Sequence, residues 1–265
     1  MKPSEILRLY QGKGVPLADI RLVLPLFGTD LDHAEIDGRE VPEEEVQAIL
    51  SRLLEGYPAA YLAGKIEILG IELFLSEDVL IPRTETEDFL RAEIFAKKDL
   101  SGKRVLDLCT GSGFIALSVK RRYPLAEVVG TDISEKALSL SRRSMEHNKL
   151  DVDFQKSDYL EEVDGLFDLV LCNPPYIPQG KRTQAPFEPE LALFSGADGM
   201  DSYRKIFPRL EAHLSPSGEA YFELEATRAE EVLLLSRRLL PGLEGEILLD
   251  MEGKKRYLHL FRRKI

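Results

Sequence analysis

Four consecutive residues, Asn173-Pro174-Pro175-Tyr176, could hold a planar NH2 group in place for a reaction. Proline fixes φ and has no backbone N–H, so the carbonyl groups of this segment stay free to accept hydrogen bonds. The Asn173 side chain adds an amide oxygen as a further acceptor. Converging acceptors beside an aromatic ring suit a side-chain amide or the exocyclic amine of a base. The simpler alternative is a proline-braced turn without a ligand, because Asn-Pro often begins a turn.

Such acceptors favour transfer of a group to nitrogen. An amide nitrogen is a poor nucleophile because its lone pair is delocalised into the carbonyl. Accepting both N–H hydrogens fixes its orientation, so that the lone pair can face an electrophilic methyl group, and positioning and electrostatics supply most of the catalysis. No strong base is needed beforehand, because the methylated nitrogen is acidic. The chain contains only two asparagines, Asn148 and Asn173. Because asparagine is rare in this chain, its presence in this segment is informative.

A second candidate site is the glycine-containing segment Asp107-Leu108-Cys109-Thr110-Gly111-Ser112-Gly113. Glycines let the backbone turn sharply and approach a ligand at the start of a helix. With Ala116 and with Asp132 about 20 residues further on, the segment also fits the fingerprint of dinucleotide-binding proteins. Asp107 would repel a pyrophosphate, whereas its charge attracts the sulfonium and amino groups of S-adenosylmethionine. Asp132 suits the ribose hydroxyls of either cofactor, so S-adenosylmethionine is favoured, with a nicotinamide dinucleotide and an empty turn as alternatives.

The two candidate sites can form one site only if a sheet brings the ends of their strands together. From Thr84 onward, short apolar runs alternate with helical patterns. The predicted strands are Arg104–Leu108, Glu127–Thr131, Asp153–Lys156, Phe167–Cys172, Gly218–Leu224, Gly245–Asp250 and Arg256–Arg262. The predicted helices are Phe114–Arg122, Ser134–Asn148, Ser202–Leu214 and Thr227–Leu240. The alternation predicts a mostly parallel sheet covered on both faces, and the short turn between the last two strands makes one of them antiparallel to the other.

The part of the chain before Thr84 has a different pattern, with short helices separated by Gly and Pro. We predict helices over Glu5–Gln11, capped by Ser4, over Pro16–Leu26, and from Pro42 to Leu54. Apolar and β-branched residues on both sides of Gly70 then predict a β-hairpin.

Composition excludes several classes of protein. The chain has 265 residues, 44% of them hydrophobic, and a net charge of −11. This balance argues against a protein whose main work is binding duplex DNA or anionic lipid. Two cysteines, Cys109 and Cys172, and four scattered histidines give no disulfide framework and no metal-ligand spacing, so we expect no metal. No apolar run reaches the roughly 18 residues of a membrane-spanning helix, and the start does not read as a signal peptide, so we expect a soluble, cytoplasmic protein.

The two candidate sites and the spacing between them resemble class I S-adenosylmethionine-dependent methyltransferases that methylate nitrogen. Further segments resemble the release factor glutamine methyltransferases (PrmC/HemK type): Tyr61–Gly64, Val79–Glu87, Phe187–Leu193 and Gly196–Asp201. This family resemblance extends from about Glu43 to Arg256. It implies an α/β fold in which a Rossmann-like methyltransferase domain (residues 84–265) follows a helical substrate-recognition domain (1–65) and a β-hairpin linker (66–83).

The resemblance also implies an activity and roles for single residues. The family methylates the glutamine side chain in the Gly-Gly-Gln motif of peptide chain release factors. Tyr159 would lie along the adenine of the cofactor, and Asn173, Pro174, Pro175 and Tyr176 would hold the substrate glutamine. The residues expected to contact S-adenosylmethionine are Asp107, Cys109, Thr110, Gly111, Ser112, Gly113, Asp132, Tyr159 and Asn173. The chain departs from the family at Cys109, where glycine is usual, at Thr84, where many members have proline, and at Glu223–Ala226.

Other activities remain alternatives. A glutamine methyltransferase of a ribosomal protein shares the tetrapeptide, although Ile81–Glu87 favours the release factor enzymes. A methyltransferase of nucleic-acid bases would need a cationic face, which the net charge of −11 argues against. A nucleotide-sensing module without turnover is less compatible with an intact Asn173–Tyr176. We expect a monomer without stable nucleic acid or membrane partners; Lys181-Arg182 could meet an acidic partner surface or form a plain polar loop.

Overall fold

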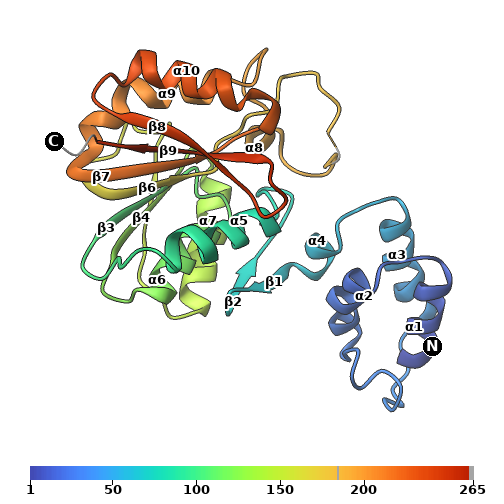
Figure 1. Ribbon diagram of the computed structural model, residues 1–265. Helices are drawn as coiled ribbons and strands as arrows, with labels where there is room; N and C mark the ends of the chain where they lie inside the picture. The colour runs from blue at the N-terminus through green and yellow to red at the C-terminus, as the bar shows by residue number, and fades with distance from the viewer. Residues whose placement is uncertain (184, 263–265) are drawn as a thin grey trace. The chain divides into compact units, whose positions relative to one another are not determined.

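The computed structural model describes residues 1–183 and 185–262 (Figure 1). The chain divides into two compact units, Met1–Ile66 with Phe74–Glu77, and Glu67–Leu73 with Asp78–Ile265. The last three residues of the predicted methyltransferase domain, 263–265, lie outside the described residues. Within the described chain, no helix combines the length and the hydropathy needed to cross a membrane.

The first unit is helical. Its elements are α1 (Pro3–Gly12), α2 (Leu17–Val23), the 3-10 turn η1 (Leu24–Phe27), α3 (Glu43–Leu54) and α4 (Ala59–Ala63). Their apolar side chains, among them Ile6, Ile20 and Leu24, form a core made only of residues from this unit. The hydroxyl of Tyr10 donates to the carbonyl of Val46 at 2.8 Å and so ties α1 to α3.

Three of the predicted helices are present, with one correction at a helix start. The prediction that Ser4 caps the first helix was wrong, because α1 begins at Pro3 and Lys2 is its N-cap. Proline fits the first helical position, and the Glu5 carboxylate accepts the Lys2 N–H at 2.7 Å. The short α4 was not predicted. The predicted hairpin consists of β1 (Lys65–Ile68) and β2 (Ile71–Phe74).

The second unit is built on a seven-stranded sheet of order β5-β4-β3-β6-β7-β9-β8. The strands are β3 (Arg104–Leu108), β4 (Glu127–Asp132), β5 (Asp153–Lys156), β6 (Phe167–Cys172), β7 (Leu214–Glu223), β8 (Glu244–Leu249) and β9 (Lys255–Phe261). Neighbours from β5 to β7 run parallel, whereas β9 is antiparallel to both β7 and β8. The predicted α/β class, mostly parallel with an antiparallel C-terminal strand, is confirmed.

Helices cover both faces of this sheet. In Figure 1, α9 and α10 lie on one face, and α5, α6 and α7 lie on the other. The helices are α5 (Thr84–Phe89), continued by the π-helical η2 (Leu90–Phe95), α6 (Phe114–Arg122), α7 (Glu135–His147), α8 (Glu190–Leu193), α9 (Asp201–Leu210) and α10 (Ala229–Leu239). The 3-10 turns η3 (Glu211–His213) and η4 (Ala226–Arg228) flank β7 and α10. Neither α5 with η2 nor α8 was predicted from the sequence.

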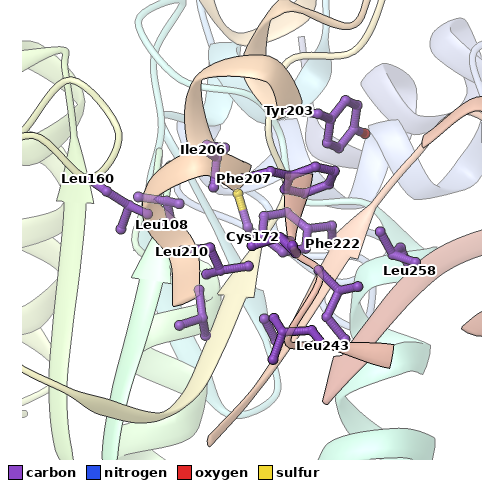
Figure 2. Packing of buried hydrophobic residues seen from close by; sticks show 14 of the residues in the cluster. Leu108, Leu160, Cys172, Tyr203, Ile206, Phe207, Leu210, Phe222, Leu243 and Leu258 are labelled. Carbon is purple, nitrogen blue, oxygen red and sulfur yellow. The ribbon is translucent and has the colours of Figure 1, made fainter. Parts of the chain in front are cut away.

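The core under α9 and α10 holds the ends of the central strands in place. Figure 2 shows Cys172 of β6 and Phe222 of β7 surrounded by apolar side chains of α9, among them Phe207. The rings of Phe207 and Phe222 meet edge to face, with their centroids 5.3 Å apart. Because Cys172 pairs with Phe222 in the sheet, Asn173, which follows β6, and Glu223, which ends β7, come directly after one pair of residues at the carboxyl ends of neighbouring strands.

Candidate active site

A cavity of about 370 Å³ lies at the carboxyl ends of β3, β4 and β6. Ligands of doubly wound α/β proteins bind at this edge of the sheet. Eight of the residues predicted from the sequence line the cavity: Cys109, Thr110, Gly111, Ser112, Asp132, Tyr159, Asn173 and Pro175. The other four, Asp107, Gly113, Pro174 and Tyr176, are not among the residues that line it.

The glycine loop, residues 107–113, turns from β3 into α6 through three left-handed residues. Cys109 has φ 64°, Gly111 φ 52° and Gly113 φ 80°. The left-handed conformation is unfavourable for residues with a Cβ, which gives a physical reason why glycine would suit position 109 better. A Cβ at Gly111 would meet no atom within 4 Å, whereas one at Gly113 would lie 3.1 Å from both Phe154 and Ser141. Gly111 therefore leaves space for a ligand, and Gly113 allows close packing.

Asp132, the last residue of β4, orders the loop and borders the cavity. Its Oδ2 accepts the N–H of Gly111 at 2.9 Å, and its Oδ1 accepts the N–H of Ser134 at 2.9 Å. Burial raises the pKa of this carboxyl group, and the backbone hydrogen bonds oppose the shift. A carboxylate with this placement can still accept hydrogen bonds from ligand hydroxyls.

Asp107 lies under the loop and is almost completely buried, with 1% exposed. Its Oδ2 accepts hydrogen bonds from Thr110 Oγ1 at 2.5 Å and from the N–H of Ala116 at 3.0 Å. Its Oδ1 has no hydrogen-bond partner among the described residues. Burial raises the pKa of Asp107 to about 7, and the negative charge of Asp132 acts in the same direction. A cation in the overlying cavity would offset this cost of burying a carboxylate.

Tyr159 joins the far wall of the cavity to α9. Its backbone is left-handed, with φ 53°, and its hydroxyl lies 2.9 Å from Ser202 Oγ. Ser202 in turn donates to the carbonyl oxygen of Pro175 at 2.8 Å. Ser202 was not predicted as a site residue, because a serine near a helix start carries no signal for such a contact.

The segment Asn173–Tyr176, called the acceptor loop below, begins directly after β6. Asn173 lines the cavity, and Pro174 is buried beside it. Neither the Asn173 side chain nor the Pro174 carbonyl has a hydrogen-bond partner in the part of the chain that the structure describes. Two acceptors next to the cavity are thus available to a ligand.

The Tyr176 side chain is directed to a buried carboxylate. Its hydroxyl donates to Glu223 Oε1 at 3.2 Å, and burial, with the nearby charge of Glu223, raises its pKa. Glu223 and its second partner, Thr86, were not predicted as site residues.

The segment Val79–Glu87 also contributes to the cavity. It resembles the family in sequence, but no role in the site was predicted for its residues. Val79, Leu80, Pro82 and Arg83 line it. Arg83 forms an ion pair with Glu188, whose side chain is only 2% exposed. Both residues belong to the segments that carried the family resemblance.

Lys181, considered above as a partner contact, is paired with Glu225 at 2.6 Å.

Comparison with known proteins shows similarity to methyltransferases. Residues 88–191 match the family model "Methyltransferase small domain". The chain is 34% identical to the release factor glutamine methyltransferase of Deinococcus radiodurans, over 85% of this chain and 83% of that protein. It is 35% identical to the protein of the same name from Streptococcus pneumoniae, over 82% and 81%.

Solved structures share the fold. A methyltransferase from Pyrococcus furiosus has a TM-score of 0.57 and 22% identity, covering 81% of this chain and 98% of that one. The catalytic domain of hMettl16 has a TM-score of 0.56 and 15% identity, covering 77% of this chain and 79% of that one.

Proposed function

The chain belongs to the family of release factor glutamine methyltransferases, and we propose that it methylates peptide chain release factors. In this proposal, it transfers a methyl group from S-adenosylmethionine to the side-chain amide nitrogen of the glutamine in their Gly-Gly-Gln motif. The observation that carries the proposal is a pair of acceptors, Asn173 and the Pro174 carbonyl, which have no hydrogen-bond partner among the described residues and lie beside the cavity that the glycine loop lines. In this proposal, the enzyme acts in the cytoplasm together with its substrate.

The residues present fit S-adenosylmethionine. When bound, this molecule supplies an electrophilic methyl group on a sulfonium. The open space above Gly111 admits a ligand close to the backbone, and Asp132 can accept hydrogen bonds from ribose hydroxyls. Asp107 provides negative charge under the loop, and the Tyr159 ring offers a surface along the adenine.

The acceptor loop orients the nucleophile. We assign the Asn173 side-chain oxygen to one N–H of the glutamine amide and the Pro174 carbonyl to the other. With both hydrogens held, the nitrogen lone pair can face the methyl carbon for in-line displacement. The new C–N bond forms as the C–S bond breaks, and the methylated nitrogen then releases one proton to water.

Mass spectrometry of a release factor, before and after incubation with the enzyme and S-adenosylmethionine, tests this function. We expect the mass of one methyl group to appear on the glutamine-containing peptide. A release factor with that glutamine changed to alanine is the matched control. A ribosomal protein and DNA serve as parallel substrates, and preferential methylation of either would replace the proposed substrate.

We further propose that the helical N-terminal unit contacts the release factor, because the acceptor loop can orient an amide but cannot recognise a whole protein. The unit has its own apolar core, so its removal leaves the core around Phe222 intact. Deletion of residues 1–64 should preserve S-adenosylmethionine binding and strongly weaken methylation of intact release factor. A short Gly-Gly-Gln peptide as substrate is the control, since its methylation should change less.

A further inference from the structure

A buried carboxylate outside the cavity joins the acceptor loop to one of the cavity walls. Glu223 is the last residue of β7 and is only 4% exposed. Its Oε1 accepts the hydrogen bond from Tyr176, and its Oε2 accepts one from Thr86 Oγ1 at 2.9 Å. Thr86 belongs to α5 and lines the cavity, whereas Tyr176 is the last residue of the acceptor loop. One side chain thus connects two segments that are distant in the sequence.

The carboxylate stands on a rigid part of the sheet. Glu223 pairs with Tyr257 of β9, and its backbone carbonyl accepts a hydrogen bond from the Tyr203 hydroxyl at 2.7 Å. The preceding residue, Phe222, pairs with Cys172, the residue before Asn173. The start of the acceptor loop is therefore fixed by the β6–β7 pairing, and its end is held by the Tyr176–Glu223 hydrogen bond together with the backbone contacts of Pro175 and Ile177.

The buried surroundings of Glu223 disfavour the ionised form of its carboxyl group. Burial raises its pKa, while the hydrogen bonds from Thr86 and Tyr176 and the positive charge of Arg256 oppose this shift. Glu85 adds a negative charge nearby. Apolar side chains of similar volume often stabilise such a position as well as a buried polar group does. A requirement for stability alone therefore does not explain a carboxylate here.

We propose that Glu223 is a positioning residue for methyl transfer, which holds Tyr176 and thereby the acceptor loop at a fixed distance from the cavity wall at Thr86. This role rests on the proposed function. Glu223 itself touches neither substrate. Its contribution is to keep the Asn173 oxygen and the Pro174 carbonyl where both can accept from the same amide. Errors of about 1 Å in such positions can reduce rates about 100-fold.

Kinetics of Glu223→Gln, Tyr176→Phe and the double variant test the proposal. Glutamine keeps the volume of the side chain but replaces one acceptor oxygen with a donor. We expect kcat on the release factor to fall at least about tenfold in each single variant, with S-adenosylmethionine affinity within about threefold of wild type. Because both changes break the same connection, the double variant should be no slower than the slower single variant.

Glu219→Gln is the matched control. Glu219 lies in the same strand, is half-buried, and is paired with Lys98 and His259 on another part of the sheet. Its substitution should lower the melting temperature and leave kcat unchanged. If Glu223→Gln folds poorly, Tyr176→Phe still decides, since it removes only one hydroxyl. Full turnover by Tyr176→Phe, multiplicative losses in the double variant, or an equal kcat loss in Glu219→Gln would overturn the proposal.

Amide hydrogen exchange separates this proposal from the proposed function. The N–H of Ile177, directly after the acceptor loop, donates to the Leu193 carbonyl at 2.9 Å. Exchange at Tyr176 and Ile177 should be faster in Glu223→Gln than in wild type or Glu219→Gln. If the wild-type enzyme methylates no release factor, the proposed function fails, and this comparison alone then decides whether Glu223 holds the loop. Unchanged exchange in Glu223→Gln would refute that role.

Discussion

The hydroxyl oxygen of Ser202 lies 2.8 Å from the carbonyl oxygen of Pro175, to which it donates a hydrogen bond. The same oxygen is 2.9 Å from the Tyr159 hydroxyl. Pro175 belongs to the loop assigned to the substrate amide, and Tyr159 to the wall assigned to the adenine. The two halves of the cavity therefore share one buried hydroxyl group at the start of α9.

Ser202→Ala should weaken both functions of the cavity. The change leaves the Pro175 carbonyl and the Tyr159 hydroxyl without this partner, at a cost of about 1–3 kcal/mol. We expect lower S-adenosylmethionine affinity in calorimetry together with a lower kcat. Ser236→Ala is the control, because Ser236 is also buried and donates to the Leu233 carbonyl at 2.8 Å in α10. Equal effects of both variants would mean that only stability is involved.

Asp132→Ala should weaken S-adenosylmethionine binding by about 1.5–3 kcal/mol, the scale of hydrogen bonds to charged groups. The variant loses the acceptor for ribose hydroxyls and also the contact that holds the Gly111 N–H. Calorimetry measures the change. Asp151→Ala removes an equal charge from an exposed position before β5 and should bind normally. Unchanged affinity of Asp132→Ala would refute the assignment, and clear binding of NAD would revive the dinucleotide alternative.

The buried carboxyl group of Asp107 predicts a pH dependence. Its pKa in the folded protein is about 7, above the value of about 3.9 in an unfolded chain. Its contribution to stability is therefore complete below about pH 4 and is lost as the pH rises through 7. Asp107→Asn keeps an acceptor for Thr110 and Ala116 but cannot ionise, so the stability of the variant relative to wild type should increase over this interval.

Binding of a cation reverses the preference of Asp107 for its proton. S-adenosylmethionine should therefore bind wild type more tightly as the pH rises toward 7, with release of a proton, and Asp107→Asn should lack most of this dependence. Calorimetry in two buffers of different ionisation enthalpy measures the released proton. The same pH dependence in both proteins would contradict the assignment of Asp107 to the cation.

The strands of the site were predictable because each has a local pattern. The apolar run Phe167–Cys172 followed by Asn-Pro gave the bounds of β6, and Arg104–Leu108 gave those of β3. The helical segment Thr84–Phe95 was missed, although Thr86, Phe89, Leu90 and Ile94 have helical spacing and are buried in it. The motif resemblance of Val79–Glu87 drew attention to that segment without indicating a helix.

Contacts between distant residues were not predictable in the same way. Thr86 and Tyr176 reach Glu223 across 137 and 47 positions of sequence. Nothing local marks a glutamate at a strand end as the partner of those two hydroxyls, because the sheet order decides which strand ends are neighbours. Likewise, the motif indicated Asp107 as a charge near the cofactor, but only the packing of Thr110 and Ala116 shows that it lies under the loop.

Asn173→Ala tests the mechanism most directly. The change removes one acceptor and leaves a substrate N–H unpaired, at roughly 1–3 kcal/mol, and misalignment of the nitrogen adds to this loss. We expect S-adenosylmethionine affinity within about tenfold of wild type and a loss of at least about 100-fold in kcat, comparable with removal of an oxyanion donor. Asn148→Ala is the control. Asn148 is the other asparagine of the chain, and its side chain forms hydrogen bonds with Glu72 and Arg121 outside the cavity.

Asn173→Asp tests the effect of an added charge while an acceptor oxygen is retained. The variant keeps an acceptor and the shape of the side chain but places a negative charge near the sulfonium. This charge should tighten cofactor binding, and it should slow methyl transfer because the reactant cation is stabilised more than the charge-dispersed transition state. Calorimetry and single-turnover kinetics on the release factor measure the two effects separately. Near-normal turnover by Asn173→Ala, or weaker cofactor binding together with faster transfer in Asn173→Asp, would mean that the amide is held elsewhere.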